Sequence, residues 1–259
     1  MQSQDVFSQV LKAVESRRKP MVKLALRPAE EKDDVLASKI LGMPYWEDGT
    51  PVPLDRHGKP LQLMAQLNLA LVPRLPWFPA QGVLQFFIAD DTEYGYAERA
   101  EIDHAKSRVI YWPLPDIRRH VPYPVMEMEF CPADAPLLIE PEEITLEHCG
   151  VEDHEAASIY TELLAEQFPD IDEDAFDAFL DDYVSNTGCK LGGFAFFTQG
   201  DPRDGCDFGT SREWIQLLQL DSVDAGMMWG DAGIAHWFIR REDLERRDFS
   251  KVFYTWDCC

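Results

Sequence analysis

The segment from Asp221 to Gly233 carries the residue types best suited to holding a ligand. Asp221, Asp224 and Asp231 supply carboxylate acceptors, and Trp229 supplies a flat ring on which a ligand can stack. Its glycines allow the backbone to approach a bound molecule closely. Met and Trp side chains are also common in protein cores, so a structural turn packed on the core is the alternative interpretation.

Three further charged residues are expected near this loop. Lys190 begins the motif KLGGFAFF, and Asp201 and Arg203 belong to the polar loop QGDPR that follows it. If the two halves of the chain pack together, these side chains come close to the loop that contains Trp229. We therefore include them among the candidate ligand-binding residues.

No complete catalytic motif accompanies these residues. The sequence contains no GxSxG, HExxH, P-loop or GxGxxG pattern, so we assign no catalytic residue, cofactor or metal. A Cys–His pair that meets only in the folded chain stays open, because such pairs need not be adjacent in sequence. Its candidates are His236, Cys206 and Cys258.

Two patterns suggest a metal site, and both are incomplete. Asp170, Asp172 and Asp174 match the start of a calcium-binding loop with Asp181 at its twelfth position, but Ala175 replaces the required glycine. Helix capping explains these carboxylates better. A second cluster consists of His148, Cys149 and His154, and no further Cys/His pair stands at a zinc-site spacing.

The charge of the chain is strongly negative and unevenly distributed. The formal net charge is −23, and the segment between His120 and Cys189 holds 19 acidic residues without a Lys or Arg. This balance argues against nucleic acid or an anionic membrane as a partner, since both select basic patches. Two interpretations remain: a solvated face that keeps the protein soluble, or a docking face for a cationic protein.

The acidic segment is expected to be helical. Residues 156–168 and 173–184 place apolar side chains on one face of each predicted helix. Asp174, Asp177 and Asp181 lie on the opposite face of the second helix, which makes them the candidate partner-binding residues. A further helix is expected over residues 5–18.

The remaining elements read as strands. Apolar or alternating runs bounded by turn residues predict strands at 21–26, 61–71, 82–89, 108–112, 125–130, 192–198, 214–220, 234–240 and 251–256, and a short strand or turn at 38–46. We find neither a signal peptide nor an apolar run of about 20 residues, and the six cysteines form no CxxC pair. These features are typical of a cytoplasmic protein with reduced thiols.

An internal duplication is suggested by four ordered matches at an offset of 151 to 153 residues. The Lys, Gly, Gln and Trp matches carry this hypothesis, because apolar matches alone arise easily. The matched segments are 39–46 with 190–197, 66–68 with 219–221, Trp77 with Trp229, and 82–88 with 233–239.

The motifs KLGGFAFFTQGDPR, LLQLDS, MMWGDAG, DFSKVFYTWDCC, PLQLMAQLNLA and GVLQFFIADD resemble the YwqG-like family of bacterial proteins of unknown function. The resemblance runs from about Ser38 to the C-terminus. It implies a compact α+β, β-rich protein, and it brings no established activity or site residue.

We therefore expect an α+β protein in one compact domain, residues 1–259, with mostly antiparallel sheets. One repeat spans about 38–112, an acidic helical insertion about 140–187, and a second repeat about 189–257. The leading functional expectation is a non-enzymatic cytosolic protein that binds a cationic protein, for example to neutralise a toxin or effector. The alternative is an enzyme or small-ligand receptor that uses loop 221–233. The oligomeric state is left open.

Overall fold

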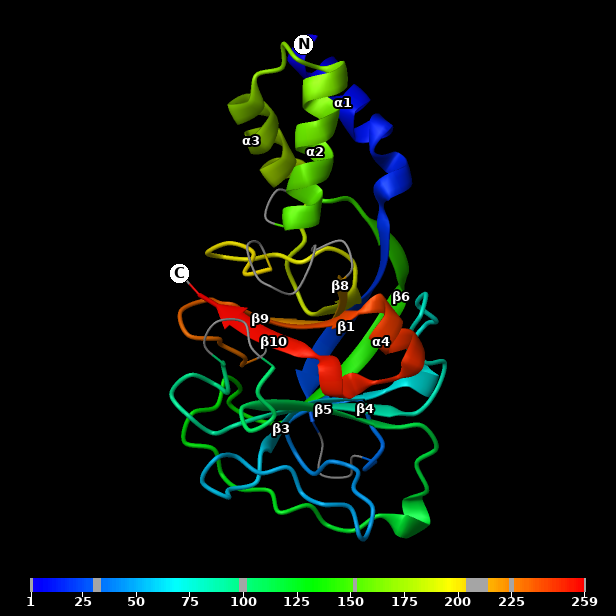
Figure 1. Cartoon of the computed structure of the whole chain (residues 1–259), viewed down its shortest axis with the longest axis vertical. Helices are drawn as coiled ribbons and strands as arrows, with labels where there is room; N and C mark the ends of the chain where they lie inside the picture. Colours follow the sequence, from blue (N-terminus) through cyan, green and yellow to red (C-terminus); the bar gives the residue numbers. More distant parts are fainter. Residues whose placement is uncertain are drawn as a thin grey trace.

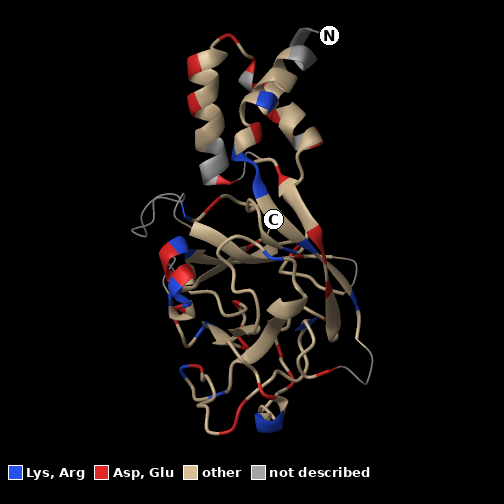
Figure 2. Ribbon diagram, turned by 90° about the vertical axis from the view of Figure 1, so that its right-hand side faces the viewer, with Lys and Arg blue, Asp and Glu red and all other residues tan. Residues whose placement is uncertain are grey.

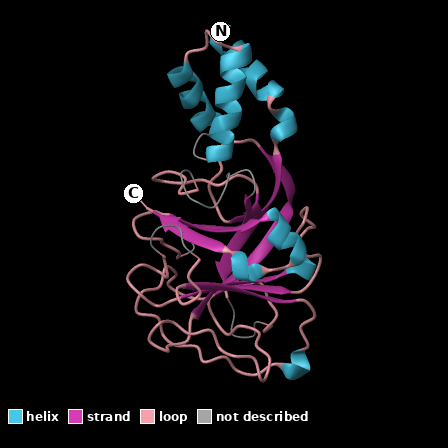
Figure 3. Cartoon of the chain, in the orientation of Figure 1, coloured by secondary structure: helices cyan, strands magenta, loops and turns pink. Residues whose placement is uncertain are grey.

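The computed structural model describes residues 2–29, 34–97, 102–150, 153–203, 214–223 and 226–258, without the side chains of 2–5, 154–157, 173 and 181. Along its long axis, the molecule consists of a lobe of three helices, a central sheet and a layer of long loops (Figure 1). The N-terminus lies in the helical lobe, and the last strand ends at the side of the sheet. The β-rich character expected from the sequence is confirmed (Figure 3).

Ten antiparallel strands form one continuous sheet in the order β10-β9-β8-β7-β1-β6-β2-β3-β4-β5. Their bounds are β1 Lys19–Pro28, β2 Lys39–Ile40, β3 Gln62–Asn68, β4 Val83–Ile88, β5 Ser107–Trp112, β6 Leu137–Glu147, β7 Lys190–Gly192, β8 Trp214–Asp221, β9 Ile234–Arg240 and β10 Phe253–Asp257. The first and second halves of the chain thus lie on opposite sides of the central pair β1 and β6.

The sheet folds back on itself, which brings its two ends together around the main core. The rings of Phe86 on β4 and Trp237 on β9 lie 5.3 Å apart. The hydroxyl of Tyr254 on β10 donates to the carbonyl of Tyr94 at 2.8 Å. Strands β4 and β9 are buried along nearly their whole length, which explains why they read as continuous apolar runs.

The two outer halves of the sheet share a pattern of hydrogen bonds made by Gln66 and Gln219. Each glutamine pairs with a lysine on the short neighbouring strand, namely Lys39 or Lys190. Each amide nitrogen donates to two loop carbonyls, and each amide oxygen accepts from a backbone N–H. The donors and acceptors are Val35 O, Ala37 O and Tyr45 N for Gln66, and Asn186 O, Gly188 O and Phe196 N for Gln219.

Each loop partner of Gln66 lies 151 residues before the corresponding partner of Gln219. The bends that end β2 and β7 are separated by the same number of residues. Leu41 and Gly42 have φ values of 57° and 79°, and Gly192 and Gly193 have 70° and 72°. One proposed match differs in its surroundings, because Trp77 is 44% exposed whereas Trp229 is fully buried.

The helical lobe consists of α1 (Gln2–Ala13), α2 (His154–Gln167) and α3 (Glu173–Tyr183). Phe7, Tyr160, Phe176 and Leu180 meet in its separate apolar core. Asp172 caps α3, since its side chain accepts a hydrogen bond from the N–H of Ala175 at 3.1 Å. Acidic residues mark the helices of this end of the molecule (Figure 2).

The remaining helical segments are short: α4 (Arg241–Arg246) and the 3-10 turns η1 (Glu15–Arg17), η2 (Leu69–Leu71), η4 (Ile117–Arg119) and η6 (Phe249–Lys251). Within the described ranges, no helix combines the length and the apolar character that crossing a membrane requires.

Several sequence-based boundaries need correction. The predicted helical insertion from about residue 140 begins instead as strand β6, which pairs with β1 over its whole length and with β2 near its start. Its exposed carboxylates mask the strand pattern, because most of β6 beyond Ile139 faces solvent on both sides. Residues 125–130 form no strand. Of the strand predicted at 192–198, only Gly192 is part of a strand, because β7 ends at this residue, where the backbone turns into the left-handed region.

Candidate functional site

The loop from Asp221 to Gly233 folds around a buried indole. Trp229 is fully buried, and its ring lies against those of Tyr94, Trp237 and Trp256 at centroid distances of 5.9, 6.3 and 6.5 Å. The hydroxyl of Ser222 donates to the carbonyl of Gly233 at 2.7 Å and accepts from the N–H of Trp229 at 2.9 Å. These bonds fasten the loop onto the core.

The two carboxylates of this loop that the structure describes, Asp221 and Asp231, form no hydrogen bond with Trp229. Asp231 is exposed at the tip, and Asp224 lies outside the described residues. Asp221, at the end of β8, accepts a hydrogen bond from the N–H of Gly188 at 2.6 Å. Burial raises the pKa of its carboxyl above the usual value, and nearby Lys190 opposes this shift.

Asp201 and Arg203 do come together in one buried ionic group, and Lys190 belongs to a second one near enough to be influenced by the charge of Asp153; the two groups form the ionic network. The ammonium of Lys190 lies 2.6 Å from a carboxylate oxygen of Glu147. The guanidinium of Arg203 lies 2.9 Å from Asp153 and 2.6 Å from Asp201. All five side chains are at most 5% exposed.

The sheet itself separates this network from Trp229. Neighbouring residues on a strand point to opposite faces. On β9, Trp237 packs with Trp229, while Phe238 carries the guanidinium of Arg203 at 4.2 Å from its ring centre. The predicted grouping of Arg203 with Trp229 is therefore not formed.

Glu147 and Asp153 are members of this network that sequence reasoning missed. The available signal is the position of Lys190 at the start of the apolar motif KLGGFAFF, since a buried cation needs an anionic partner. Asp153 also accepts from the N–H of Ala195 at 3.0 Å, and its neighbouring cations hold the pKa of its carboxyl below the usual range despite its burial.

His236 lies on the same face of β9 and completes the buried polar group. Its ring packs on Phe197 at 4.4 Å, and its Nδ1 faces the side-chain oxygen of Gln216 at 3.4 Å. Burial, aided by the charges of Arg203 and Lys190, lowers the pKa of His236 well below its usual value. The ring is therefore neutral at physiological pH.

Of the cysteines proposed for chemistry, the structure describes only Cys258. Cys258 is partly exposed beside Gly230, and Cys206 lies outside the described residues. Cys149 and Cys189 are buried thiols, and burial raises the pKa of Cys189 to about 12. A thiol with a raised pKa is a poor nucleophile, because the thiolate is the reactive form.

Two of the candidate metal ligands, Asp172 and His148, contact other protein groups. Asp172 caps α3, and the imidazole Nε2 of His148 lies 3.4 Å from a carboxylate oxygen of Glu15. The side chain of His154 is outside the description. Among the residues that are described, no three His, Cys, Asp or Glu side chains gather in a way that could hold a metal ion.

The candidate partner-binding residues lie on α3. Asp174 and Asp177 are exposed, and Asp181 belongs to the helix although its side chain is not described. The opposite face of α3 is fully packed, with Phe176 and Leu180 at 0% and 1% exposure. Tyr183, 59% exposed, stacks on Phe179 at 5.5 Å at the end of the same helix.

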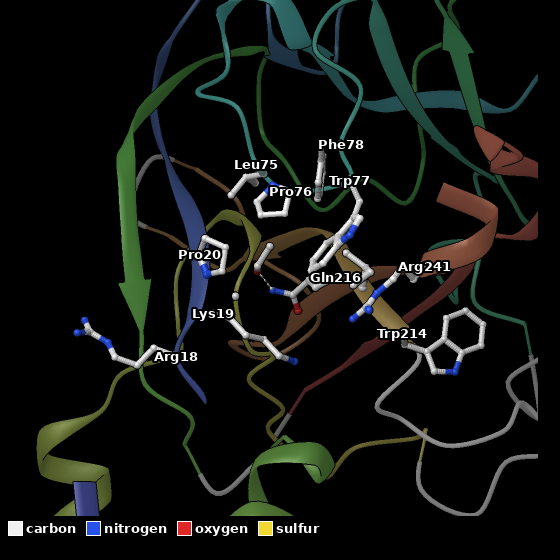
Figure 4. Close-up of a pocket in the computed structure, with 13 residues that line it drawn as sticks. Arg18, Lys19, Pro20, Leu75, Pro76, Trp77, Phe78, Trp214, Gln216 and Arg241 are labelled. Carbon is white, nitrogen blue, oxygen red and sulfur yellow. Dashed lines mark hydrogen bonds between the residues drawn. The ribbon is translucent and has the colours of Figure 1, made fainter. Parts of the chain in front are cut away.

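A cleft of about 230 Å³ lies between the start of β1, the turn at residues 75–78 and the start of β8 (Figure 4). None of the sequence-predicted site residues lines it. Its lining includes Arg18, Lys19, Trp77, Gly193, Gln216 and Arg241. The side-chain nitrogen of Gln216 donates to the carbonyl of Gly192 at 2.9 Å, which ties β8 to the end of β7.

A fold does not by itself establish a function, so the family of this chain is taken from its sequence. Residues 38–258 match the model of a family described as a domain of unknown function, DUF1963, and the chain belongs to this family. No curated protein matches the chain. The central strand β1 and helix α1 precede the matched span.

Proposed function

We propose that this protein is a non-enzymatic binding protein that docks a cationic protein on the acidic face of α2 and α3. The observation that carries the proposal is that α3 exposes both carboxylates and an aromatic ring. Asp177 and Asp182 are exposed, and so is Tyr183, which follows Asp182 in the chain. Tyrosine is enriched in protein interfaces, where its ring is buried at little entropic cost.

The position of Asp182 supports this interpretation over a purely solvating one. The residue lies in the last turn of α3, where the helix macrodipole presents its negative end and disfavours a carboxylate. Neither α2 nor α3 contains a Lys or Arg that would offset it. The carboxylate of Asp182 is present although the dipole of α3 disfavours it, and it is followed by the exposed Tyr183. Both features fit a surface whose charge is neutralised by a bound partner.

The test is affinity capture from a lysate of cells that express the protein, with three forms of the chain as bait. The double variant Asp177→Lys, Asp182→Lys should lose a basic partner that the unmodified chain retains. The matched control Glu242→Lys, Glu245→Lys makes the same change in net charge at exposed positions of α4. Equal loss in both variants, or equal retention, contradicts docking on α3.

The finer parts of the sequence interpretation belong to the same proposal. The matched hydrogen bonds of Gln66 and Gln219 support an internal duplication, with the helical lobe acquired by one half. The resemblance to YwqG-like bacterial proteins is compatible with membership of the DUF1963 family. Four described cysteines are free thiols, which supports the proposed cytoplasmic location.

The alternative function, a small-ligand receptor built on loop 221–233, rests on residues that lie apart in the fold. Trp229 is enclosed by other aromatic rings, and Asp231 is exposed whereas Arg203 is buried in its ion pairs. The cleft beside Trp77 is the better location for a small ligand.

A further inference from the structure

The cleft between β1, residues 75–78 and β8 has a charge opposite to that of the whole molecule. The chain carries a net charge of −23, yet the charged residues that line the cleft, among those described, are Arg18, Lys19 and Arg241. Three cations and no carboxylate attract an anion, because a concave wall of one sign focuses the field into the opening.

These three cations do not all face the same way. Arg18 is held outward by Glu15, 2.8 Å from its guanidinium, and by the carbonyl of Leu146. Lys19 and Arg241 extend into the cleft from opposite sides (Figure 4). Lys19 also lies 4.2 Å from the ring centre of Phe194. Arg241 and Lys19 are therefore better placed than Arg18 to bind an anion, although Lys19 also lies close enough to Asp153 to lower the pKa of that carboxyl.

Trp77 supplies a flat apolar surface next to Arg241. Its guanidinium carbon lies 4.5 Å from the centre of the indole ring, and the tryptophan is 44% exposed. The backbone of Trp77 has φ of +64°, a left-handed conformation that is strained for a bulky side chain. Strain of this kind gathers at ligand clamps, where the surrounding structure holds a side chain in a required place.

The floor of the cleft depends on close backbone approach. Gly192 and Gly193 both have positive φ, and a Cβ on Gly193 would collide with the carboxylate of Glu147. This carboxylate is neutralised by Lys190, so it does not oppose an anion in the cleft. Close packing against Pro20 and Glu147 thus requires glycine at both positions.

The corresponding place in the first half of the sheet offers a contrast. A second cleft, of about 330 Å³, is lined by Leu41 and Gly42 after β2 and by Leu63 of β3. Among its described lining residues there is no Lys or Arg, whereas Glu127 and Asp134 are present. Of these two clefts, only the one beside Trp77 has cations among its described lining residues. Its positive charge therefore does not follow from the backbone conformation that the two halves of the sheet have in common.

We propose that the cleft beside Trp77 binds a small organic anion with one aromatic ring. The ring lies along the indole of Trp77, and the anionic group lies between Lys19 and Arg241. The volume of about 230 Å³ sets the size, since pockets for drug-sized ligands span roughly 300–1,000 Å³. Arginine beside an aromatic ring suits both parts of such a ligand.

The test is calorimetric titration of the full chain with phenyl phosphate, with benzyl alcohol and inorganic phosphate as single-feature probes. Phenyl phosphate should bind at one site at least tenfold more tightly than either probe. Arg241→Gln and Lys19→Gln should each weaken it about tenfold or more. The matched control Arg118→Gln, at an exposed arginine outside the cleft, should leave the affinity unchanged.

Trp77→Gly separates a binding role from a packing role. Glycine accepts the left-handed backbone, so the melting temperature should be maintained or rise while the preference for phenyl phosphate over inorganic phosphate is lost. Absence of saturable binding, equal affinity for all three probes, or unchanged affinity in Arg241→Gln would overturn the proposal. None of these variants touches α3, so this result and that of the acidic-face test are separate.

Discussion

The ammonium of Lys190 lies 2.6 Å from a carboxylate oxygen of Glu147, and both side chains are at most 5% exposed. The other carboxylate oxygen accepts a hydrogen bond from the N–H of Phe194 at 2.8 Å. Burial lowers the pKa of Lys190, and the neighbouring carboxylate opposes that shift. Each charge is therefore tolerated inside the protein because the other is present.

Removing only the cation should be strongly destabilising. Lys190→Met leaves Glu147 buried and unpaired, which costs about 3–5 kcal/mol of unfolding free energy. The double variant Lys190→Met, Glu147→Gln should lose less, because no buried charge remains and the new amide oxygen can still accept from Phe194. Urea denaturation measures both. A double variant less stable than Lys190→Met would show that the pair is not the main contribution.

His236 should make stability depend on pH. Its folded-state pKa is well below the unfolded value of about 6.5, so below that pH the unfolded chain binds a proton that the folded chain does not. Stability is then fully present above about pH 6.5 and falls with decreasing pH, by up to about 1.4 kcal/mol per pH unit.

The matched variant is His236→Gln, since Gln85 holds the corresponding position opposite Gln66 in the first half of the sheet. Between pH 7.5 and pH 5.0, the urea midpoint of this variant should decrease less than that of the unmodified protein. The carboxylates that titrate in this range are common to both proteins. An identical pH dependence would mean that His236 does not contribute.

The core of the helical lobe distinguishes two phenylalanines of α3. Phe176 is fully buried, and its replacement by Ala should cost about 3–5 kcal/mol. Phe179 is only partly buried, although the sequence pattern places it in the core, so Phe179→Ala should cost less. Thermal melting of both variants provides the measurement, and a larger loss for Phe179→Ala would contradict the packing.

The two ends of α3 should respond oppositely to charge reversal. Asp182→Lys replaces a carboxylate near the negative end of the helix dipole and should stabilise the protein by about 0.3–1 kcal/mol. Asp174→Lys, in the first turn, should destabilise it by a similar amount. Chemical denaturation at low ionic strength tests the pair. Shifts of the same sign would remove the dipole argument for Asp182.

Strands with buried, apolar sequences could be predicted well, because their residue types report burial directly. Strands β4 and β9 lie within the predicted ranges. Strand β6 was missed because its exposed carboxylates resemble a solvated helical segment, and only its pairing with β1 reveals it. Local charge pattern cannot report a partner strand that is more than a hundred residues away.

The candidate site was harder to predict for the same reason. Lys190 and Arg203 were identified, but their partners Glu147 and Asp153 lie about 40 to 50 residues earlier in the chain. The cleft gathers Lys19, Trp77 and Arg241 from three distant segments. No spacing rule connects such residues, and the left-handed backbone of Trp77 is visible only in the fold.

The central claim is most directly tested by the association kinetics of the captured partner as a function of salt. Exposed charges are screened beyond about 8–10 Å near physiological ionic strength, and electrostatic steering acts mainly on encounter. The association rate constant should therefore fall steeply as salt rises. In Asp177→Lys, Asp182→Lys it should be low and depend weakly on salt, while Glu242→Lys, Glu245→Lys should follow the unmodified protein. A rate constant that neither salt nor the α3 variant changes would contradict docking on the acidic face.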